Sequence, residues 1–192
     1  MMSAHIGRLR AMSSGHVHTK AEALKILRET DRSFSALLDR LPPRTFTTPG
    51  IGGGGWSPKD LIAHLAFWEV SALEAMDAWE RGDRAPIDVA LRSTTLHLVN
   101  QEGLVRMSKG SAAGVGKRAL QVHDQLLGRI RSMPTRRWNS PPTPRGRRPL
   151  GVRIGSILGG PGGPFMHAHA HLADLASFVQ QHGRGGSTGA QR

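Results

Sequence analysis

The chain has 192 residues with 26 basic and 14 acidic side chains, which gives a net charge of +12. It contains no cysteine, which excludes disulfides, thiolate metal sites and a cysteine nucleophile. No apolar run reaches the ~18–20 residues that cross a bilayer, and the N-terminus lacks the apolar core of a secretory signal. We therefore expect a cytoplasmic protein that makes no membrane contact.

The length suits one domain flanked by two tails. We expect a disordered leader over residues 1–18, a helical domain over 19–182 and a disordered tail over 183–192. Arg8 and Arg10 stand in the leader without an acidic residue, so a transit-like segment is the alternative there.

Two helices are well marked at their ends. The first begins with a capping box at residues 19–22, continues with apolar residues at spacings of three and four, and ends at the prolines of 41–43. The second begins at Ser57, which is the expected N-cap with Asp60 three residues later. The Arg-Gly pair at 81–82 ends it.

The middle of the chain is less regular. Residues 88–108 are ambiguous and are expected to be helical in part. The stretch KGSAAGVG at 109–116 is a poor helix start, because glycine weakens helices. A third long helix is expected from 116 to 133, where apolar residues again recur on one face.

A loop rich in proline, glycine and arginine is expected over 134–163, and within it residues 152–158 are predicted to extend or pair briefly. A last helix is expected from 164 to 181. Four substantial helices, one long basic loop before the last of them and no sheet favour an all-α four-helix bundle.

The stretch PFMHAHAHLADL at 164–175 places His167, His169 and His171 at every second position. In a strand all three would share one face, but the apolar residues that follow recur at helical spacing, so we prefer a helix. At about 100° per residue, His167 and His171 lie about 40° apart on its apolar face, and His169 lies about 200° from His167.

Two histidines at i and i+4 can bind one metal ion, but they need a third ligand. His64 is the candidate, because it lies about 60° from the centre of the apolar stripe of the second helix. Three imidazoles with an open fourth position are typical of a catalytic metal site, and facing helices of a bundle can bring them together. The alternative is that His64 is a core histidine.

His123, on the third long helix, is either a core histidine bonded to a carbonyl or a polar group that faces a substrate.

Two histidine motifs occur in an order and at a distance that fit a known family. GGGGWSPKDLIAHLAFWE at 52–69 carries Trp, Ser, Asp and then His-Leu, and GPFMHAHAHLADL at 163–175 carries His-x-x-x-His followed by an apolar residue and Asp-Leu. The segments between the two motifs also fit this family: residues 72–86 (ALEAMDAWERGDRAP) resemble the end of its second helix, and residues 122–138 (VHDQLLGRIRSMPTRRW) resemble its third helix. Over about residues 19–182 the chain resembles the DinB-like superfamily.

The resemblance implies a divalent metal ion, Zn²⁺ or Ni²⁺, on His64, His167 and His171. Such proteins include mycothiol-dependent maleylpyruvate isomerase, other low-molecular-weight thiol transferases and ClbS-like proteins that protect against a genotoxin, and they are often homodimers. We therefore expect a metal-dependent enzyme, either a thiol-dependent transferase or isomerase or a hydrolase, that acts on a small electrophilic molecule. Because the chain has no cysteine, any thiol must come from a cosubstrate.

Two other functions compete with the enzyme. One is a non-catalytic module that captures a small molecule for self-protection. The other is nucleic-acid binding through the eight arginines between Arg129 and Arg153, which would be weak and salt-sensitive. No base-reading motif accompanies them, so we expect a solvated loop and no nucleic-acid ligand. Five arginines could instead hold a carboxylate of the substrate or thiol: Arg136, Arg137, Arg145, Arg147 and Arg148.

Overall fold

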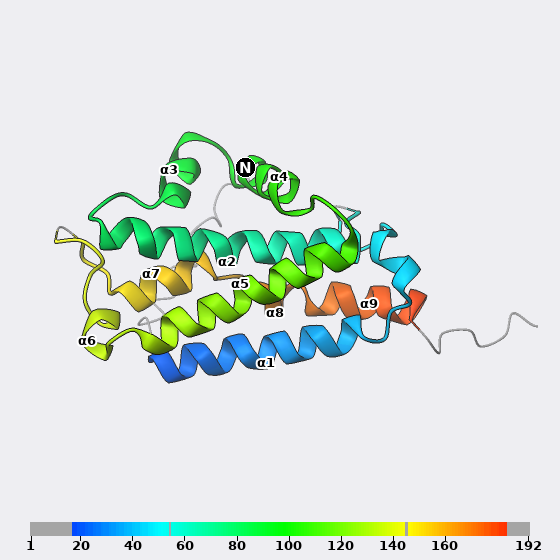
Figure 1. Cartoon of the computed structure of the whole chain (residues 1–192), viewed down its shortest axis with the longest axis horizontal. Helices are drawn as coiled ribbons and strands as arrows, with labels where there is room; N and C mark the ends of the chain where they lie inside the picture. The colour runs from blue at the N-terminus through cyan, green and yellow to red at the C-terminus, as the bar shows by residue number, and fades with distance from the viewer. Residues whose placement is uncertain (1–16, 54, 145, 184–192) are drawn as a thin grey trace, which may run out of the picture.

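The computed structural model describes residues 17–53, 55–144 and 146–183. Within these ranges the chain forms helices and turns, and no strand is present beyond two isolated bridges. The prediction of an all-α four-helix bundle is confirmed (Figure 1). Most of the expected disordered leader and tail, residues 1–16 and 184–192, lies outside the described residues.

Nine α-helices and one short 3-10 helix make up the described chain. They are α1 (Lys20–Leu38), η1 (Pro43–Thr47), α2 (Pro58–Glu80), α3 (Pro86–Ser93), α4 (Leu96–Met107), α5 (Ala112–Ser132), α6 (Thr135–Trp138), α7 (Leu150–Ile157), α8 (His167–Ala170) and α9 (Leu172–His182).

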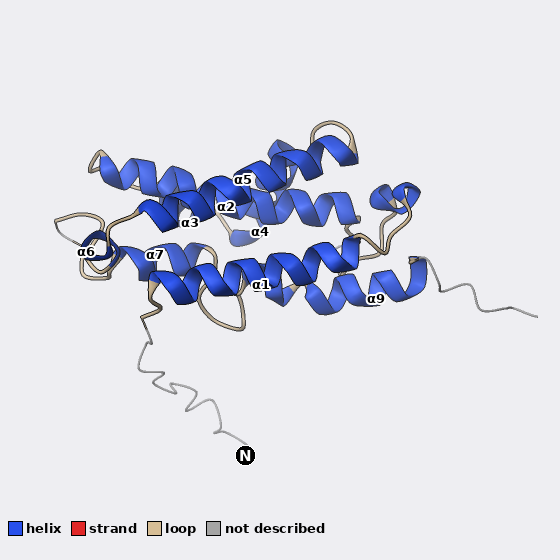
Figure 2. Ribbon diagram, turned by 60° about the horizontal axis from the view of Figure 1, so that its bottom comes forward, coloured by secondary structure: helices blue, strands red, loops and turns tan. Residues whose placement is uncertain are grey.

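Helices α1, α2 and α5 are the long members of the bundle, and α7, α8 and α9 lie end to end in the fourth position (Figures 1 and 2). Helix α2 is central, since it packs against α5, α4, α3 and α7. Helix α1 contacts α5, α8 and α9. Side chains from the N-terminal helix α1, the central helix α2 and the C-terminal helix α8 can therefore come close together in the fold.

The two predicted helix starts are confirmed in detail. The Thr19 hydroxyl accepts a hydrogen bond from the backbone N–H of Glu22, whose carboxylate accepts one from the backbone of Thr19. Ser57 and Asp60 form the same reciprocal pair at the start of α2. Such caps satisfy backbone groups that the first helical turn leaves unpaired.

The middle of the chain is more helical than the sequence pattern indicated. Residues 88–108 contribute to two separate helices, α3 and α4. Helix α5 begins at Ala112, four residues before the predicted start, so the poor start at 109–116 is a wrong prediction. The Ser111 hydroxyl accepts a hydrogen bond from the backbone N–H of Gly114, and this cap compensates for the glycines.

The prediction that residues 152–158 extend or pair is also wrong, because this segment belongs to α7. Leu150, Ile154 and Leu158 recur every four residues, and all three are buried in the main core. Their burial on one helical face stabilises a helix inside the predicted loop. The last predicted helix, 164–181, begins at His167 and is interrupted at His171, which separates α8 from α9.

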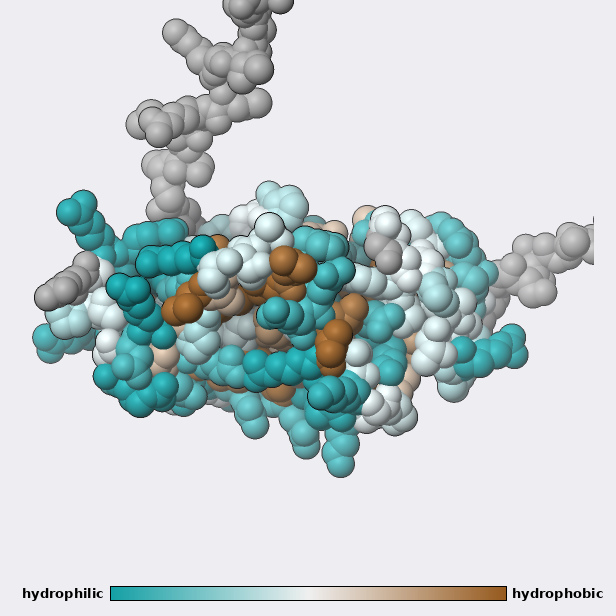
Figure 3. Space-filling view, turned by 90° about the horizontal axis from the view of Figure 1, so that it is seen from above, coloured by the Kyte–Doolittle hydropathy of each residue, from teal (hydrophilic) through white to brown (hydrophobic). Residues whose placement is uncertain are grey.

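One face of the molecule, formed by α3 and α4, carries exposed apolar side chains (Figure 3). The residues concerned are Val89, Leu91, Leu96, Leu98 and Val105. Protein contacts often cover such surfaces, but the expected homodimer stays a prediction. No helix in the described part of the chain is long and apolar enough to cross a membrane.

Candidate metal centre and its pocket

His64 stands in the second turn of α2 and is almost fully buried, with 3% of its surface exposed. The capping box at Ser57 fixes the start of this helix, and a short turn places Trp56 beside the histidine through the Ile51–Trp56 bridge. The Trp56 and His64 rings lie 4.7 Å apart between centroids. The imidazole is therefore held by packing on a rigid element.

The other two histidines come from the junction of α8 and α9. Nε2 of His167 lies 3.0 Å from Nε2 of His64. The His171 ring lies 5.3 Å from each of these two rings between centroids. One nitrogen from each of the three histidines falls within 4.8 Å of the others. His169 is exposed and takes no part, as its position on the helical wheel indicated.

The electrostatics of the cluster favour uncharged imidazoles. Burial, followed by repulsion from His167 and His171, lowers the pKa of His64 from 6.5 to about 3. Burial and repulsion from His171 lower the pKa of His167 to about 4. Burial also lowers the pKa of His171, against the attraction of Asp174. All three rings are therefore neutral near pH 7, the state in which histidine binds metal ions.

The donor set fits a divalent ion of the zinc or nickel type. Zn²⁺ binds imidazole nitrogens at about 2.0–2.1 Å, so two nitrogens on one tetrahedral ion lie about 3.3 Å apart, near the separation of His64 and His167. Nδ1 of His64 is buried and has no hydrogen-bond partner among the described residues. Contact with Trp56, rather than the usual second hydrogen bond, orients this ring.

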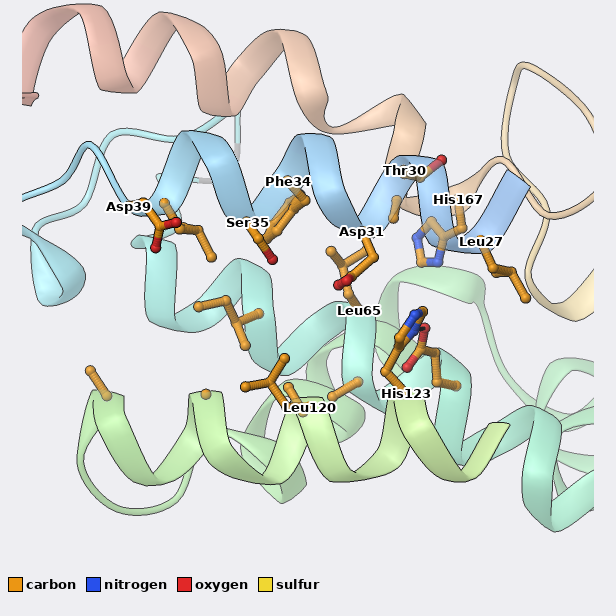
Figure 4. Close-up of a pocket in the computed structure, with 18 of the residues that line it drawn as sticks. Leu27, Thr30, Asp31, Phe34, Ser35, Asp39, Leu65, Leu120, His123 and His167 are labelled. Atoms are coloured by element: carbon orange, nitrogen blue, oxygen red, sulfur yellow. Dashed lines mark hydrogen bonds and ion pairs between the residues drawn. The ribbon is translucent and has the colours of Figure 1, made fainter. Parts of the chain in front are cut away.

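A pocket of about 490 Å³ adjoins His167 and runs between α1 and α5, with α2 as its floor (Figure 4). Its walls are mainly apolar, and they include Phe34 on α1, Leu65 on α2 and Leu120 on α5. Asp31 and His123 lie at the same end as His167. This volume suits a small organic molecule bound beside the histidine cluster.

His123 differs from the prediction of a core histidine bonded to a carbonyl. Its Nδ1 donates to the Glu69 carboxylate over 2.7 Å, and its ring lines the pocket. Burial alone would lower the pKa of His123, but the hydrogen bond to Glu69 and the charges of Glu69, Asp31 and Asp124 outweigh burial and raise it. Nε2 of His123 is buried without a partner in the described part of the chain.

The arginines expected to hold a substrate carboxylate lie elsewhere. Among the described residues that line the histidine pocket there is no arginine and no lysine. Arg137 donates to two backbone carbonyls of its own segment, and Arg148 donates to Ser156. Arg147 lines a different pocket beside Trp79, and Arg145 lies outside the described residues. The expectation is therefore wrong for the described arginines, because the loop folds back on α2, α3 and α7.

The sequence pattern did not single out Glu69 or Asp31 as parts of the site. Glu69 follows His64 by five residues on α2, and Asp31 stands among polar residues of α1. Their roles depend on the packing of α5 and α1 against α2, which helical periodicity does not reveal.

A family model described as the DinB superfamily matches residues 26–159. The chain belongs to the DinB superfamily. The match includes His64 and ends before His167 and His171, so it does not bear on the last two residues of the cluster. No curated protein matches the chain.

Solved structures of DinB-like proteins share the fold at low identity. Mycothiol-dependent maleylpyruvate isomerase is 17% identical, with a TM-score of 0.60 over 82% of this chain and 61% of that chain. The colibactin self-resistance protein ClbS, solved with a dsDNA, is 14% identical, with a TM-score of 0.66 over 83% of this chain and 94% of that chain. YfiT from Bacillus subtilis, described as a probable metal-dependent hydrolase with an unusual four-helix bundle topology, is 14% identical, with a TM-score of 0.51 over 92% of this chain and 94% of that chain.

Proposed function

We propose that this DinB protein is a metal-dependent enzyme that acts on a small organic molecule. The observation that carries the proposal is the convergence of His64, His167 and His171, with His167 also lining a mainly apolar pocket. The three imidazoles would hold a divalent ion, Zn²⁺ or Ni²⁺. When bound, such an ion would act as a Lewis acid and would acidify a water or a thiol near neutral pH.

The protein's own residues supply the rest of the site. The apolar walls would bind the body of the substrate and exclude water from the reacting end. His123 would accept or release a proton at Nε2, while the Glu69 carboxylate accepts the Nδ1 hydrogen and so fixes the tautomer of the neutral ring. These parts suit a thiol transfer to an electrophile, an isomerisation that passes through a thiol adduct, or a hydrolysis. A thiol-dependent reaction requires a low-molecular-weight thiol as cosubstrate.

The direct test is the metal content of untagged protein, measured by elemental analysis. We expect about one divalent ion per chain in the wild type and in His169→Ala, whose histidine is exposed and serves as the matched control. His64→Ala and His171→Ala should lose the ion. Equal metal content in all four proteins, or no ion in any of them after reconstitution, would refute the metal centre.

The competing function is capture without turnover, as the self-resistance role of ClbS suggests. Mass spectrometry separates the two once a ligand is found. Repeated product release supports the enzyme, whereas loss of one ligand per chain supports capture. The cytoplasmic location and the homodimer remain predictions.

Nucleic-acid binding is the weaker alternative. ClbS was solved with dsDNA, and residues 129–153 of this chain are rich in arginine. Several of these arginines already have internal partners: Arg129 bonds Asp77 and Glu80, and Arg153 bonds Asp88. We expect duplex DNA to be released at about 0.15 M salt, because salt at that concentration weakens binding that depends on only a few phosphate contacts. Retention at that salt would favour the nucleic-acid function.

A further inference from the structure

The pocket beside the histidine cluster has an electrostatic character opposite to that of the chain. The protein carries 26 basic and 14 acidic side chains. The ionisable residues that line the pocket are Asp31, Asp39, Glu69, His123 and His167, and no lysine or arginine joins them among the described residues. In the metal-free protein, acidic side chains therefore outnumber lysine and arginine among the described residues that line the pocket.

One wall carries the acidic groups in a regular pattern. Asp31 and Ser35 on α1 and the exposed C-cap residue Asp39 recur every four residues, so they stand on one face of the helix, and Figure 4 shows this face turned to the pocket. The two carboxyl groups are about 12 Å apart along the helix axis, at 1.5 Å per residue. Asp31 lies near His123 and His167, whereas Asp39 lies at the far end of the pocket.

Asp31 is the carboxylate best placed to meet a ligand. It is half-buried, and among the described residues it has no hydrogen bond and no ion pair, although its charge helps to raise the pKa of His123. The neighbouring carboxylate, Glu69, is already engaged by Nδ1 of His123. A half-buried carboxylate beside an apolar wall is stabilised by a cation more strongly than an exposed one, because less water screens the pair.

The opposite wall suits an apolar body. Helix α5 offers small residues, Ala112, Ala113, Gly116 and Ala119, which leave room against α1. Phe34 and Leu65 supply a larger apolar surface on the other sides. The volume of about 490 Å³ accommodates a ring with a short alkyl chain.

We propose that the pocket binds an amphiphilic organic amine, with its ammonium group on Asp31 and its apolar body between α1 and α5. This inference rests on the proposed function in one respect, namely that the pocket is the substrate pocket of the histidine centre. It assigns the substrate class: a cationic amine, and not the carboxylate that the arginine-rich segment first suggested. In the metal-free protein, a carboxylate in this place would meet Asp31 and Asp39 without a lysine or arginine among the described lining residues to balance it.

The test compares three probes that differ only in the head group: 4-phenylbutylamine, 4-phenylbutan-1-ol and 4-phenylbutanoate. Binding to the full chain is measured by isothermal titration calorimetry at pH 7.5, with metal bound and after chelation. A fourth probe, the trimethylammonium analogue of the amine, retains the charge but has no lone pair for a metal ion. In the chelated protein we expect the amine and its trimethylammonium analogue to bind roughly tenfold more tightly than the alcohol, and the carboxylate most weakly.

Variants locate the site. Asp31→Asn should remove the roughly tenfold preference for the amine over the alcohol. Asp124→Asn, which changes the same charge on α5 outside the pocket, should retain it. Ala119→Phe should weaken all four probes, because the ring fills the space between α1 and α5. A melting curve of each variant confirms that it is folded.

Equal binding of the amine and the alcohol to chelated wild-type protein would overturn the proposal, and so would tighter binding of the carboxylate to that protein. Equal effects of Asp31→Asn and Asp124→Asn would show a general charge effect and would also overturn it. The head-group preference is measured in chelated protein as well, whereas the metal centre is tested by elemental analysis. A failure of either idea is therefore distinguishable from a failure of the other.

Discussion

Nε2 of His64 lies 3.0 Å from Nε2 of His167, although 103 residues separate them in the chain. The contact joins the buried face of α2 to the short helix α8. The His171 ring, 5.3 Å from each of the other two between centroids, completes the cluster. Keeping three neutral histidines together has consequences for stability that can be measured without knowing the substrate.

The first consequence concerns the pH dependence of the metal-free protein. The folded pKa values of His64 and His167, about 3 and about 4, lie below the unfolded value of 6.5. The unfolded chain therefore takes up protons first as the pH falls below 6.5, and the folded state loses stability. We expect the urea midpoint to fall between pH 6.5 and 5, and His64→Gln to show a shallower fall.

His123 contributes with the opposite sign, because its folded pKa is raised. Its contribution is complete below pH 6.5 and is lost as the pH rises through the folded value, so it does not produce the acid fall. A midpoint that stays constant from pH 6.5 to 5 would contradict the burial of neutral histidines.

The second prediction concerns added metal. An ion that binds only the folded state stabilises it by about 2.7 kcal/mol at a free concentration 100 times its Kd. We expect Zn²⁺ or Ni²⁺ to raise the Tm of chelated wild-type protein and of His169→Ala, and to leave His64→Ala unchanged. An equal rise in all three would indicate binding at other histidines.

The third prediction concerns the Glu69–His123 pair. Glu69→Gln removes one of the charges that, together with the hydrogen bond to His123, outweigh burial, so the pKa of His123 should fall. The histidine ring signals followed by NMR during a pH titration report this change. Glu74→Gln is the matched control, since Glu74 stands on the same helix and pairs with Arg106. A pKa of His123 that is equal in the two variants would show that Glu69 does not govern its protonation.

The fourth prediction tests the packing of α4 on α2. A Cβ added at Gly103 would lie 2.4 Å from the Phe67 ring, which is itself buried. Gly103→Ala should therefore destabilise the protein by about 1–3 kcal/mol. Gly128→Ala, in α5 with no atom within 4 Å of its added Cβ, should stabilise it by about 0.5–1 kcal/mol. Urea unfolding measures both, and a similar midpoint shift in the two variants would contradict the close approach of α4.

Several features of this protein follow from local sequence alone. The capping boxes at Thr19 and Ser57 depend on side chains three residues apart, so they are visible without any tertiary contact. The same holds for the helical face shared by His167 and His171 and for the outward direction of His169. These are short-range relations, and the periodicity of the helix determines them.

Other features were decided only by the way the helices pack. The Glu69–His123 bond, the position of Asp31 in the pocket and the 3.0 Å approach of His64 to His167 all join separate helices. The helical state of α7 depends on burial against the core, and the direction of the arginines depends on how their segment folds back. Local pattern shows which face of a helix is apolar, but it does not show which neighbour that face will meet or at what register. For this reason the sequence determined the bundle and the candidate ligands, while the tertiary structure decided the shape and charge of the pocket that they face.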